Sequence, residues 1–298
     1  QKNATFVAMK NYNFTATTES TLLDFLFEQC ASDSKTTVRS FLRNRQVSVN
    51  GCMSTHFDFP IKAGDSVEIV LERTAAALHH PMVRIVWQDD YLLVVEKRSG
   101  LLSIATDKET KRTAYFIISE YLKSIDPAAK VFVVHRLDRE TSGLMLFAKD
   151  EKTKFLMQSA WNDTVIERRY VAVCEGVIDE AQGVISTYLT ESKALKVYAT
   201  TRENGKVATT AYKVLKTSAK KNLSLLELEL QTGRKNQIRA HLEHVNHSII
   251  GDKKYGATAP SPIGRVALHA MTIKFIHPIT GEELSFATPI PISFSKLF

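Results

Sequence analysis

The chain has 298 residues, of which 44% are hydrophobic and 24% are charged. This composition is typical of a globular protein with a buried core, and it excludes a disordered chain. No apolar run approaches the ~18 residues of a membrane span, and the first twenty residues lack the pattern of an export signal. We therefore expect a cytoplasmic protein without membrane association. Because the chain begins with Gln1 rather than Met, that expectation covers these residues alone.

The charge and the cysteine content of the chain indicate which partners and which covalent or metal sites to expect. The net charge is +7, and residues 1–75 contain eight basic and eight acidic residues, so the whole excess lies in residues 76–298. A basic domain favours a polyanionic partner. The three cysteines are far apart and form no CxxC pair, so neither a disulfide framework nor a zinc site is expected.

The N-terminal part is expected to form a small module. Residues 1–18 lack hydrophobic periodicity and are predicted to be a frayed lead-in. Apolar residues at helical spacing then predict two short helices within residues 19–72. A strand that runs into an Asn50-Gly51 turn and a second strand at 66–71 complete an α/β module. Residues 73–82 are interpreted as a linker.

Short strands dominate residues 83–298. Because strands follow strands and helices are inserted irregularly, we predict a mixed α+β domain on a mainly antiparallel sheet. The predicted strands are 83–87, 92–95, 131–134, 144–148, 170–173, 209–215, 223–230 and 267–275, and the predicted helices are 113–123, 151–161 and 235–245.

A charged loop between two apolar strands carries the strongest chemical signal. Residues 135–143 read HRLDRETSG, so Arg136 and Arg139 flank Asp138. Neighbouring cations favour the charged form of a carboxylate, and such a carboxylate can act as a nucleophile or base. An ordinary solvated loop could contain the same residue types.

This segment resembles the signature of the RluA-type pseudouridine synthase family, whose core is His-Arg-Leu-Asp, two variable positions and Thr-Ser-Gly. The resemblance implies an isomerase that converts uridine to pseudouridine in structured RNA without a cofactor. It implies that Asp138 is the catalytic aspartate. It also implies that Arg136 helps to fill the space left by a flipped-out uridine.

A second segment, 231–242, reads QTGRKNQIRAHL and follows a predicted strand. On a helix, Arg239 lies about 100° from Ile238 of the buried stripe, where it can reach a partly buried carboxylate. Arg234 precedes the helix, where free backbone N–H groups suit a phosphate. A surface helix with solubilising cations is the simpler interpretation.

The same segment resembles the family pattern Gly-Arg, two positions, Gln-Ile-Arg, one position, His-Leu. The resemblance implies that Arg239 pairs with the catalytic aspartate and that Arg234 and Gln237 contact the substrate. Asn236 stands where the family commonly has His, which bears on substrate contacts more than on catalysis.

Three further segments are similar to the family. Residues 167–176 resemble the segment whose tyrosine stacks on the target base, which implies this role for Tyr170. Residues 249–256 and 267–270 match too, and are interpreted as a turn and a strand. At 97–102 the proline that commonly follows the lysine is missing.

Residues 20–71 resemble the small RNA-binding domain of the fourth small-subunit ribosomal protein. Lys35, Arg39 and Arg43 recur every four residues and drift only ~40° per step, so they share one helix face and could follow a phosphate backbone. A solvated helix face is the ordinary explanation of such spacing.

The function predicted from the sequence is therefore isomerisation of uridine in RNA, with large-subunit ribosomal RNA favoured over transfer RNA. We expect a monomer that needs no cofactor. We also expect no metal, because His241, His244 and His247 have no cysteine and only Glu243 beside them. The alternatives are a non-catalytic RNA-binding or ribosome-associated protein and a nucleoside-hydrolysing glycosidase, which would need a second carboxylate.

Overall fold

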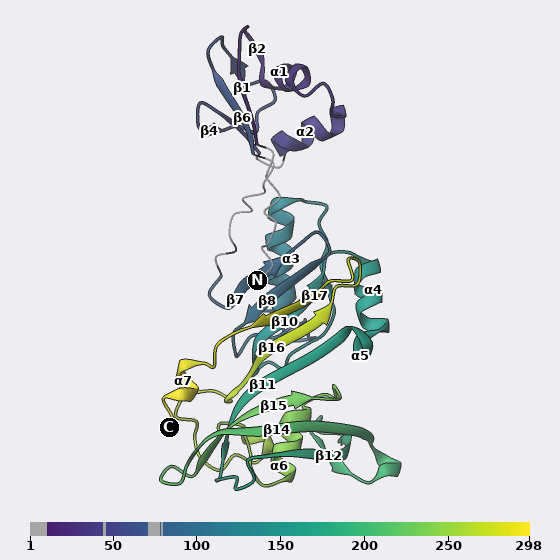
Figure 1. Ribbon diagram of the computed structural model, residues 1–298, viewed down its shortest axis with the longest axis vertical. Coiled ribbons are helices and arrows are strands. Elements are labelled where there is room, and N and C mark those ends of the chain that lie inside the picture. The colour runs from purple at the N-terminus through teal and green to yellow at the C-terminus, as the bar shows by residue number, and fades with distance from the viewer. Residues whose placement is uncertain (1–10, 44–45, 71–77, 79) are drawn as a thin grey trace, which may run out of the picture. The chain divides into compact units, whose positions relative to one another are not determined.

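The structure is a computed structural model that describes residues 11–43, 46–70, 78 and 80–298 (Figure 1). The chain divides into two compact units. The first ends at Ala77 and the second runs from Leu78 to Phe298, except that Ile125–Pro127 group with the first. Within the described part, no helix is both long and apolar enough to cross a membrane.

The N-terminal unit combines a small sheet with two helices. Its antiparallel sheet has the strand order β1-β6-β3-β4, and a separate ribbon pairs β2 with β5. The elements are β1 (Asn11–Thr15), β2 (Ser20–Thr21), α1 (Leu22–Gln29), α2 (Lys35–Arg43), β3 (Val47–Val49), β4 (Cys52–Met53), β5 (Pro60–Ile61) and β6 (Ser66–Val70).

Local sequence explains the boundaries of these elements. Helix α1 begins after Thr21 because the threonine Oγ1 accepts a hydrogen bond from the Asp24 N–H at 3.2 Å, which caps the first turn. Asn50 and Gly51 form the turn between β3 and β4 with φ values of 51° and 77°. Both angles are positive, as a two-residue hairpin turn requires, and the Asn-Gly pair provides them at low cost.

The segment 11–15 differs from the sequence prediction. It forms strand β1, which pairs with β6 so that Phe14 lies opposite Val67. The Phe14 ring packs edge-on against Phe25 with 6.3 Å between the ring centroids. The prediction of a frayed lead-in is therefore wrong here, because two alternating aromatic residues are too few to reveal a strand period. Residues 1–10 of that predicted lead-in lie outside the described residues.

The second unit is built on one large twisted sheet. Its main path is β13-β12-β14-β15-β11-β16-β10-β8-β7, with β17 paired to β16 and β9 paired to β10. The strands are β7 (Val83–Gln88), β8 (Leu92–Lys97), β9 (Phe132–Val133), β10 (Ser142–Ala148), β11 (Val165–Glu175), β12 (Gln182–Glu191), β13 (Val197–Thr200), β14 (Lys206–Ser218), β15 (Leu223–Leu230), β16 (Leu268–Ile276) and β17 (Glu283–Ala287).

Helices are inserted between these strands at irregular intervals. They are α3 (Ala114–Ile125), α4 (Glu151–Ser159), α5 (Trp161–Thr164), α6 (Gln237–His244) and α7 (Ile292–Ser295), with 3₁₀ turns η1 (Arg202–Asn204) and η2 (Lys253–Tyr255). In Figure 1 helix α6 lies beside the β12–β15 end of the sheet, whereas α3 and α4 lie near its other end. The predicted mixed α+β class with a mainly antiparallel sheet is confirmed.

One junction in this sheet is parallel. Strands β10 and β16 pair in parallel, with Gly143 opposite Ala270. Gly143 has φ +118°, and a Cβ atom at this position would lie 2.1 Å from the Ala270 carbonyl oxygen. Only glycine fits such a close backbone approach. The junction therefore fixes where the loop before β10 meets the sheet.

Strands β12, β13 and β17 and helix α7 of the second unit were not predicted, and the start of helix α6 was misplaced. Strands β12 and β13 were missed because the exposed apolar residues Val184 and Tyr198 stand next to buried apolar residues and so interrupt the alternation of apolar and polar positions. Helix α6 begins at Gln237, two residues later than predicted. The reason is that Asn236 adopts a left-handed conformation, with φ 51° and ψ 23°, which no α-helix accommodates.

Candidate active site

The loop that contains Asp138 is fixed by buried contacts on both sides of the aspartate. On one side, Leu137 is buried, and its N–H donates to the Ser103 Oγ at 3.1 Å while that hydroxyl donates to the Leu137 carbonyl at 2.6 Å. On the other side, the Thr141 N–H donates to the Asp138 carbonyl at 3.1 Å and closes a turn. The Asp138 side chain itself stays 23% exposed.

A buried lysine also holds this loop. The Nζ atom of Lys97, a fully buried residue, donates to the carbonyls of Arg98 at 3.1 Å, Leu101 at 2.8 Å and Arg139 at 3.3 Å. Burial lowers the pKa of Lys97 to about 8, although the charges of Asp138 and Glu140 oppose that shift. The ammonium group thus ties the residue after Asp138 to the loop that follows β8.

Arg239 of helix α6 joins two carboxylates. Its Nε and Nη2 donate to Asp252 at 2.6 and 2.8 Å, and its Nη1 donates to the Asp138 Oδ2 at 3.3 Å. The Asp252 side chain is 1% exposed and that of Arg239 10% exposed. Burial acts to lower the pKa of Arg239, but the hydrogen bonds and charge of Asp252, together with the charge of Asp138, raise it above its usual range. Arg239 is therefore a fixed cation beside Asp138.

Asn236 contacts the same carboxylate. With its amide nitrogen facing Asp138, Asn236 donates to the Oδ2 and Oδ1 atoms at 2.6 and 2.9 Å, and its oxygen accepts from the Tyr255 hydroxyl at 2.9 Å. This orientation provides a suitable partner for both ends of the amide. Tyr255 is fully buried, and its hydroxyl also accepts from the Val197 N–H at 3.1 Å. The position of Asn236 is thus set by the core.

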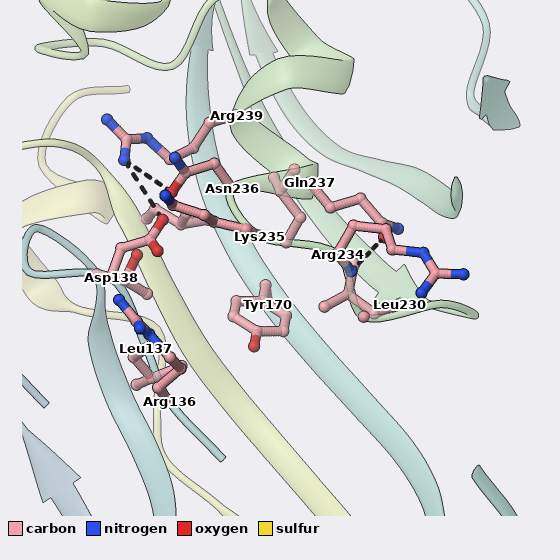
Figure 2. Close-up of a pocket in the computed structure, with 14 residues that line it drawn as sticks. Arg136, Leu137, Asp138, Tyr170, Leu230, Arg234, Lys235, Asn236, Gln237 and Arg239 are labelled. Atoms are coloured by element: carbon pink, nitrogen blue, oxygen red, sulfur yellow. Dashed lines mark hydrogen bonds and ion pairs between the residues drawn. The ribbon is translucent and has the colours of Figure 1, made fainter. Parts of the chain in front are cut away.

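These side chains surround a pocket of about 270 Å³. Figure 2 shows Asp138 and Arg239 on one side and Tyr170 of β11 beside them. Burial raises the pKa of Tyr170 to about 12; the charge of Arg168 opposes this shift and that of Asp138 adds to it. Tyr170 is therefore an uncharged phenol near neutral pH. Of the described residues that line the pocket, Asp138 is the only carboxylate.

The structure brings the other predicted residues of this domain to the same pocket. Arg136 is exposed at the loop, and the Nε of the exposed Arg234 donates to the Val207 carbonyl at 3.0 Å (Figure 2). Gln237 is buried: its Oε1 accepts from Thr232 and from the Arg234 N–H, and its Nε2 donates twice to the neighbouring strand. The carboxamide thus holds the loop before α6, and its contact with RNA stays a prediction.

The predicted RNA-contact residues of the N-terminal unit lie on helix α2. Lys35 and Arg39 are exposed, and their charged groups lie 5.9 and 5.3 Å from the ring centroid of Phe27. The side chain of Arg43 lies outside the described part of the chain. Two of the three predicted cations therefore share one helix face over an aromatic ring.

Two of the three histidines of α6 and the turn after it form hydrogen bonds within the protein, whereas His244 is exposed. His241 is buried and forms hydrogen bonds with Thr210 at 2.9 Å and Thr187 at 3.1 Å, and His247 bonds to the Glu175 carbonyl at 2.9 Å. Among the described residues no group of three or more His, Cys, Asp or Glu side chains is arranged to hold a metal ion.

Sequence reasoning missed Asp252, Tyr255 and the contact of Asn236 with Asp138. Residues 249–256 were interpreted only as a turn, because nothing in a local pattern shows that a buried carboxylate 13 positions from Arg239 is its main partner. The departure at Asn236 was the available signal. It was attributed to substrate contacts, whereas the side chain lies against the carboxylate.

With this geometry in place, the chain can be compared with known proteins. Residues 91–244 match the family model described as RNA pseudouridylate synthase. This match puts the chain in a class of RNA-modifying isomerases. An uncharacterized RNA pseudouridine synthase of Bacillus subtilis, YhcT, is 30% identical over 267 residues, which cover 89% of this chain and 88% of the relative.

Two further proteins extend the comparison. Ribosomal large subunit pseudouridine synthase D of Nitrosomonas europaea is 27% identical and covers 89% of this chain and 79% of its own length. The solved structure of human RNA pseudouridylate synthase domain containing 4 is 26% identical, with a TM-score of 0.58 over 72% of this chain and 90% of that one. The chain belongs to the RNA pseudouridylate synthase family and is an isomerase that acts on RNA.

Proposed function

We propose that the chain isomerises uridine in large-subunit ribosomal RNA and that Asp138 is the catalytic carboxylate. The assignment of Asp138 rests on one observation. Asp138 is the single carboxylate of the described pocket lining, and both its neighbours, Arg239 and Asn236, donate hydrogen bonds to it. Those donors stabilise the charged form of the Asp138 carboxylate and fix the orientation of its side chain.

The reaction needs few groups from the protein. The bond between uracil N1 and the ribose C1′ breaks, the uracil turns within the pocket, and a bond forms between uracil C5 and C1′. The proton leaves C5 and N1 gains one, so the product is an isomer of the substrate. Asp138 either adds to C1′ or removes a ribose proton, and both roles require a charged carboxylate that faces the nucleotide.

The remaining pocket residues suit an extruded nucleotide. A uridine cannot react while it is stacked in a helix, so it must be flipped out of the RNA. Tyr170 offers an uncharged aromatic ring for stacking on the uracil, and the exposed Arg136 is free to occupy the gap in the RNA. Arg234 precedes helix α6, and its exposed guanidinium suits a phosphate.

The choice of ribosomal RNA rests on relatives and on the N-terminal unit. Relatives from Nitrosomonas europaea and Pasteurella multocida are both named ribosomal large subunit pseudouridine synthase D, each 27% identical to this chain. The N-terminal unit supports binding to structured RNA, because Lys35 and Arg39 share an exposed helix face. Transfer RNA is the alternative substrate.

Two other functions fit the site less well. A glycosidase that hydrolyses a nucleoside bond uses a pair of carboxylates, but Asp252 is engaged by Arg239 and does not line the described pocket. A non-catalytic RNA-binding protein would not need the buried arrangement that orients Asp138.

Mapping pseudouridine in total RNA from cells with and without this gene tests the proposal. We expect one or a few sites in large-subunit ribosomal RNA to lose the modification, and a gene that encodes Asp138→Asn should fail to restore it. A loss confined to transfer RNA would reject the proposed substrate. Restoration by Asp138→Asn would reject the proposed residue.

A further inference from the structure

A second pocket adjoins the one that contains Asp138. It has a volume of about 330 Å³ and shares five lining residues with the first pocket, which are Arg136, Tyr170, Leu230, Gly233 and Arg234. The other lining residues are Val134, His135, Gln158, Trp161 and Arg168. Three of these ten residues are arginines, and none of the described lining residues is a carboxylate. The lining is therefore cationic.

Arg168 is the most firmly held of these arginines. It precedes Tyr170 by two positions on β11, and its guanidinium lies 5.8 Å from the centroid of the Trp161 ring. Its Nη2 donates to the Leu230 carbonyl at 3.3 Å. A Cβ atom on Gly233 would lie 2.6 Å from the Nη1 atom, so the glycine leaves space for the guanidinium.

Within the described residues, Arg168 forms no ion pair with a carboxylate. Burial lowers its pKa, although the nearby Tyr170 opposes that shift. The contrast with Arg239 is direct, because that arginine contacts Asp252 and Asp138. A partly buried cation without an acidic partner leaves its charge available to an anionic ligand.

Apart from Arg136 and Arg234, the rest of the wall is uncharged. The His135 Nε2 accepts a hydrogen bond from the Leu146 N–H at 3.0 Å, and burial, aided by the charge of Arg168, lowers the pKa of His135 to about 3. The imidazole is therefore neutral. Its ring packs against Trp161 with 5.2 Å between centroids, so the indole already contacts both His135 and Arg168. Charge, rather than base stacking, is what this pocket offers.

We propose that this second pocket binds the backbone phosphate of the nucleotide next to the target uridine, with Arg168 as the anchoring contact. An RNA strand that places a uridine against Asp138 and Tyr170 must continue beyond the first pocket. Arg136 and Arg234 line both pockets, so a strand that passes them enters the second pocket. A phosphate is acceptor-only and anionic, which matches a wall of guanidinium groups. The inference rests on the proposed function, since it takes the uridine to occupy the first pocket.

The test measures the binding of an RNA stem-loop that has one uridine in its loop. Each loop phosphate is replaced in turn by a neutral methylphosphonate, and affinity is compared for the full-length protein and for Arg168→Met. In the wild type, one linkage adjacent to the uridine should be several-fold more sensitive than the others. Arg168→Met should bind the unmodified RNA about tenfold more weakly, and replacing that linkage should cause no further loss.

Two variants control this comparison. Arg202→Met removes the same charge from an exposed residue outside both pockets and should keep the linkage-specific effect. Gly233→Ala keeps Arg168 but displaces its guanidinium, so it should resemble Arg168→Met even if the latter is poorly folded. If the losses caused by Arg168→Met and by the methylphosphonate multiply at every linkage, the subsite does not exist.

The two proposals can fail separately. The linkage effect is measured by binding alone, so it is obtained whether or not the protein modifies ribosomal RNA. If the RNA map supports ribosomal RNA and no linkage depends on Arg168, the phosphate subsite is rejected while the proposed function stands. A linkage effect together with modification confined to transfer RNA would support the phosphate subsite and reject ribosomal RNA as the substrate.

Discussion

The two units of the chain use positive charge differently. The first 75 residues carry no net charge, and Lys35 and Arg39 lie on an exposed helix face over Phe27. In the larger unit, which holds the whole basic excess, Lys97 and Arg239 are buried and have fixed acceptors. Exposed cations gain affinity from phosphates in a salt-dependent way, whereas buried cations orient particular groups. We therefore expect the N-terminal unit to contribute affinity alone, whereas the larger unit contributes both chemistry and contacts to the RNA.

The largest effect should come from Asp138→Asn. The substitution keeps the shape of the side chain and removes its charge, so turnover should fall below detection while RNA affinity and the free energy of unfolding change little. Single-turnover assays, equilibrium binding and thermal unfolding measure the three quantities. Substantial turnover by this variant would remove Asp138 from the mechanism.

Arg239→Ala should lower turnover about 10²–10³-fold, in the range seen when one donor to a developing charge is removed. RNA affinity should fall far less. Because Asp252 is 1% exposed, losing its partner should also cost about 3–5 kcal/mol of stability. Asp252→Asn is the matched control, since it keeps Arg239 beside Asp138 and should retain more activity. A loss of affinity alone would make Arg239 a phosphate contact.

A smaller loss is expected for Asn236→Ala, which removes the hydrogen bonds to both oxygens of Asp138. Hydrogen bonds to a charged group contribute about 1.5–3 kcal/mol, so turnover should fall roughly ten- to a hundredfold at unchanged affinity. Asn236→His restores an N–H donor and should recover part of the rate. Equal rates in the wild type and Asn236→Ala would show that Arg239 alone orients the carboxylate.

The double substitution Lys35→Ala and Arg39→Ala should affect binding and not chemistry. If both residues contact phosphates, the log–log slope of affinity against salt should decrease by about 1.4–1.8, at 0.7–0.9 per contact. Turnover at saturating RNA should be unchanged. Lys62→Ala, which removes an exposed cation of the same unit outside α2, should leave the slope nearly intact. An unchanged slope for the double variant would assign all RNA binding to the larger unit.

No effect at all is expected from EDTA. The isomerisation redistributes bonds within one nucleotide and requires no redox partner or group donor, so an RNA folded in monovalent salt should be converted in excess chelator. Product formation with and without EDTA is the measurement. Inactivation by the chelator would contradict the cofactor-free mechanism and direct attention to His241, His244 and His247.

Local sequence patterns identified the elements that local rules determine. The capped helix after Thr21, the Asn50-Gly51 turn and the mixed sheet all follow from spacing and turn chemistry. The proximity of Arg239 and Asp138 was also predicted, but from the family resemblance; helix geometry alone indicated only that Arg239 could reach a partly buried carboxylate.

Contacts between distant segments were beyond those rules. Asp252 follows helix α6 in a turn, and its pairing with Arg239 depends on how that turn folds back. Two of the three carbonyls around Lys97 lie within four residues of it, but the third, from Arg139, is 42 residues away, so nothing near position 97 predicts it. Strand β1 was missed for the opposite reason, since it is too short to display a period.

Gly143, which ends the HRLDRETSG segment, has a structural role that does not involve contact with the substrate. At φ +118° and in backbone contact with Ala270, Gly143 lets two strands run side by side in parallel within an otherwise antiparallel sheet. Part of the family signature is therefore an architectural requirement. A protein of this fold that lost the catalytic aspartate would still need this glycine to keep its two parallel strands together.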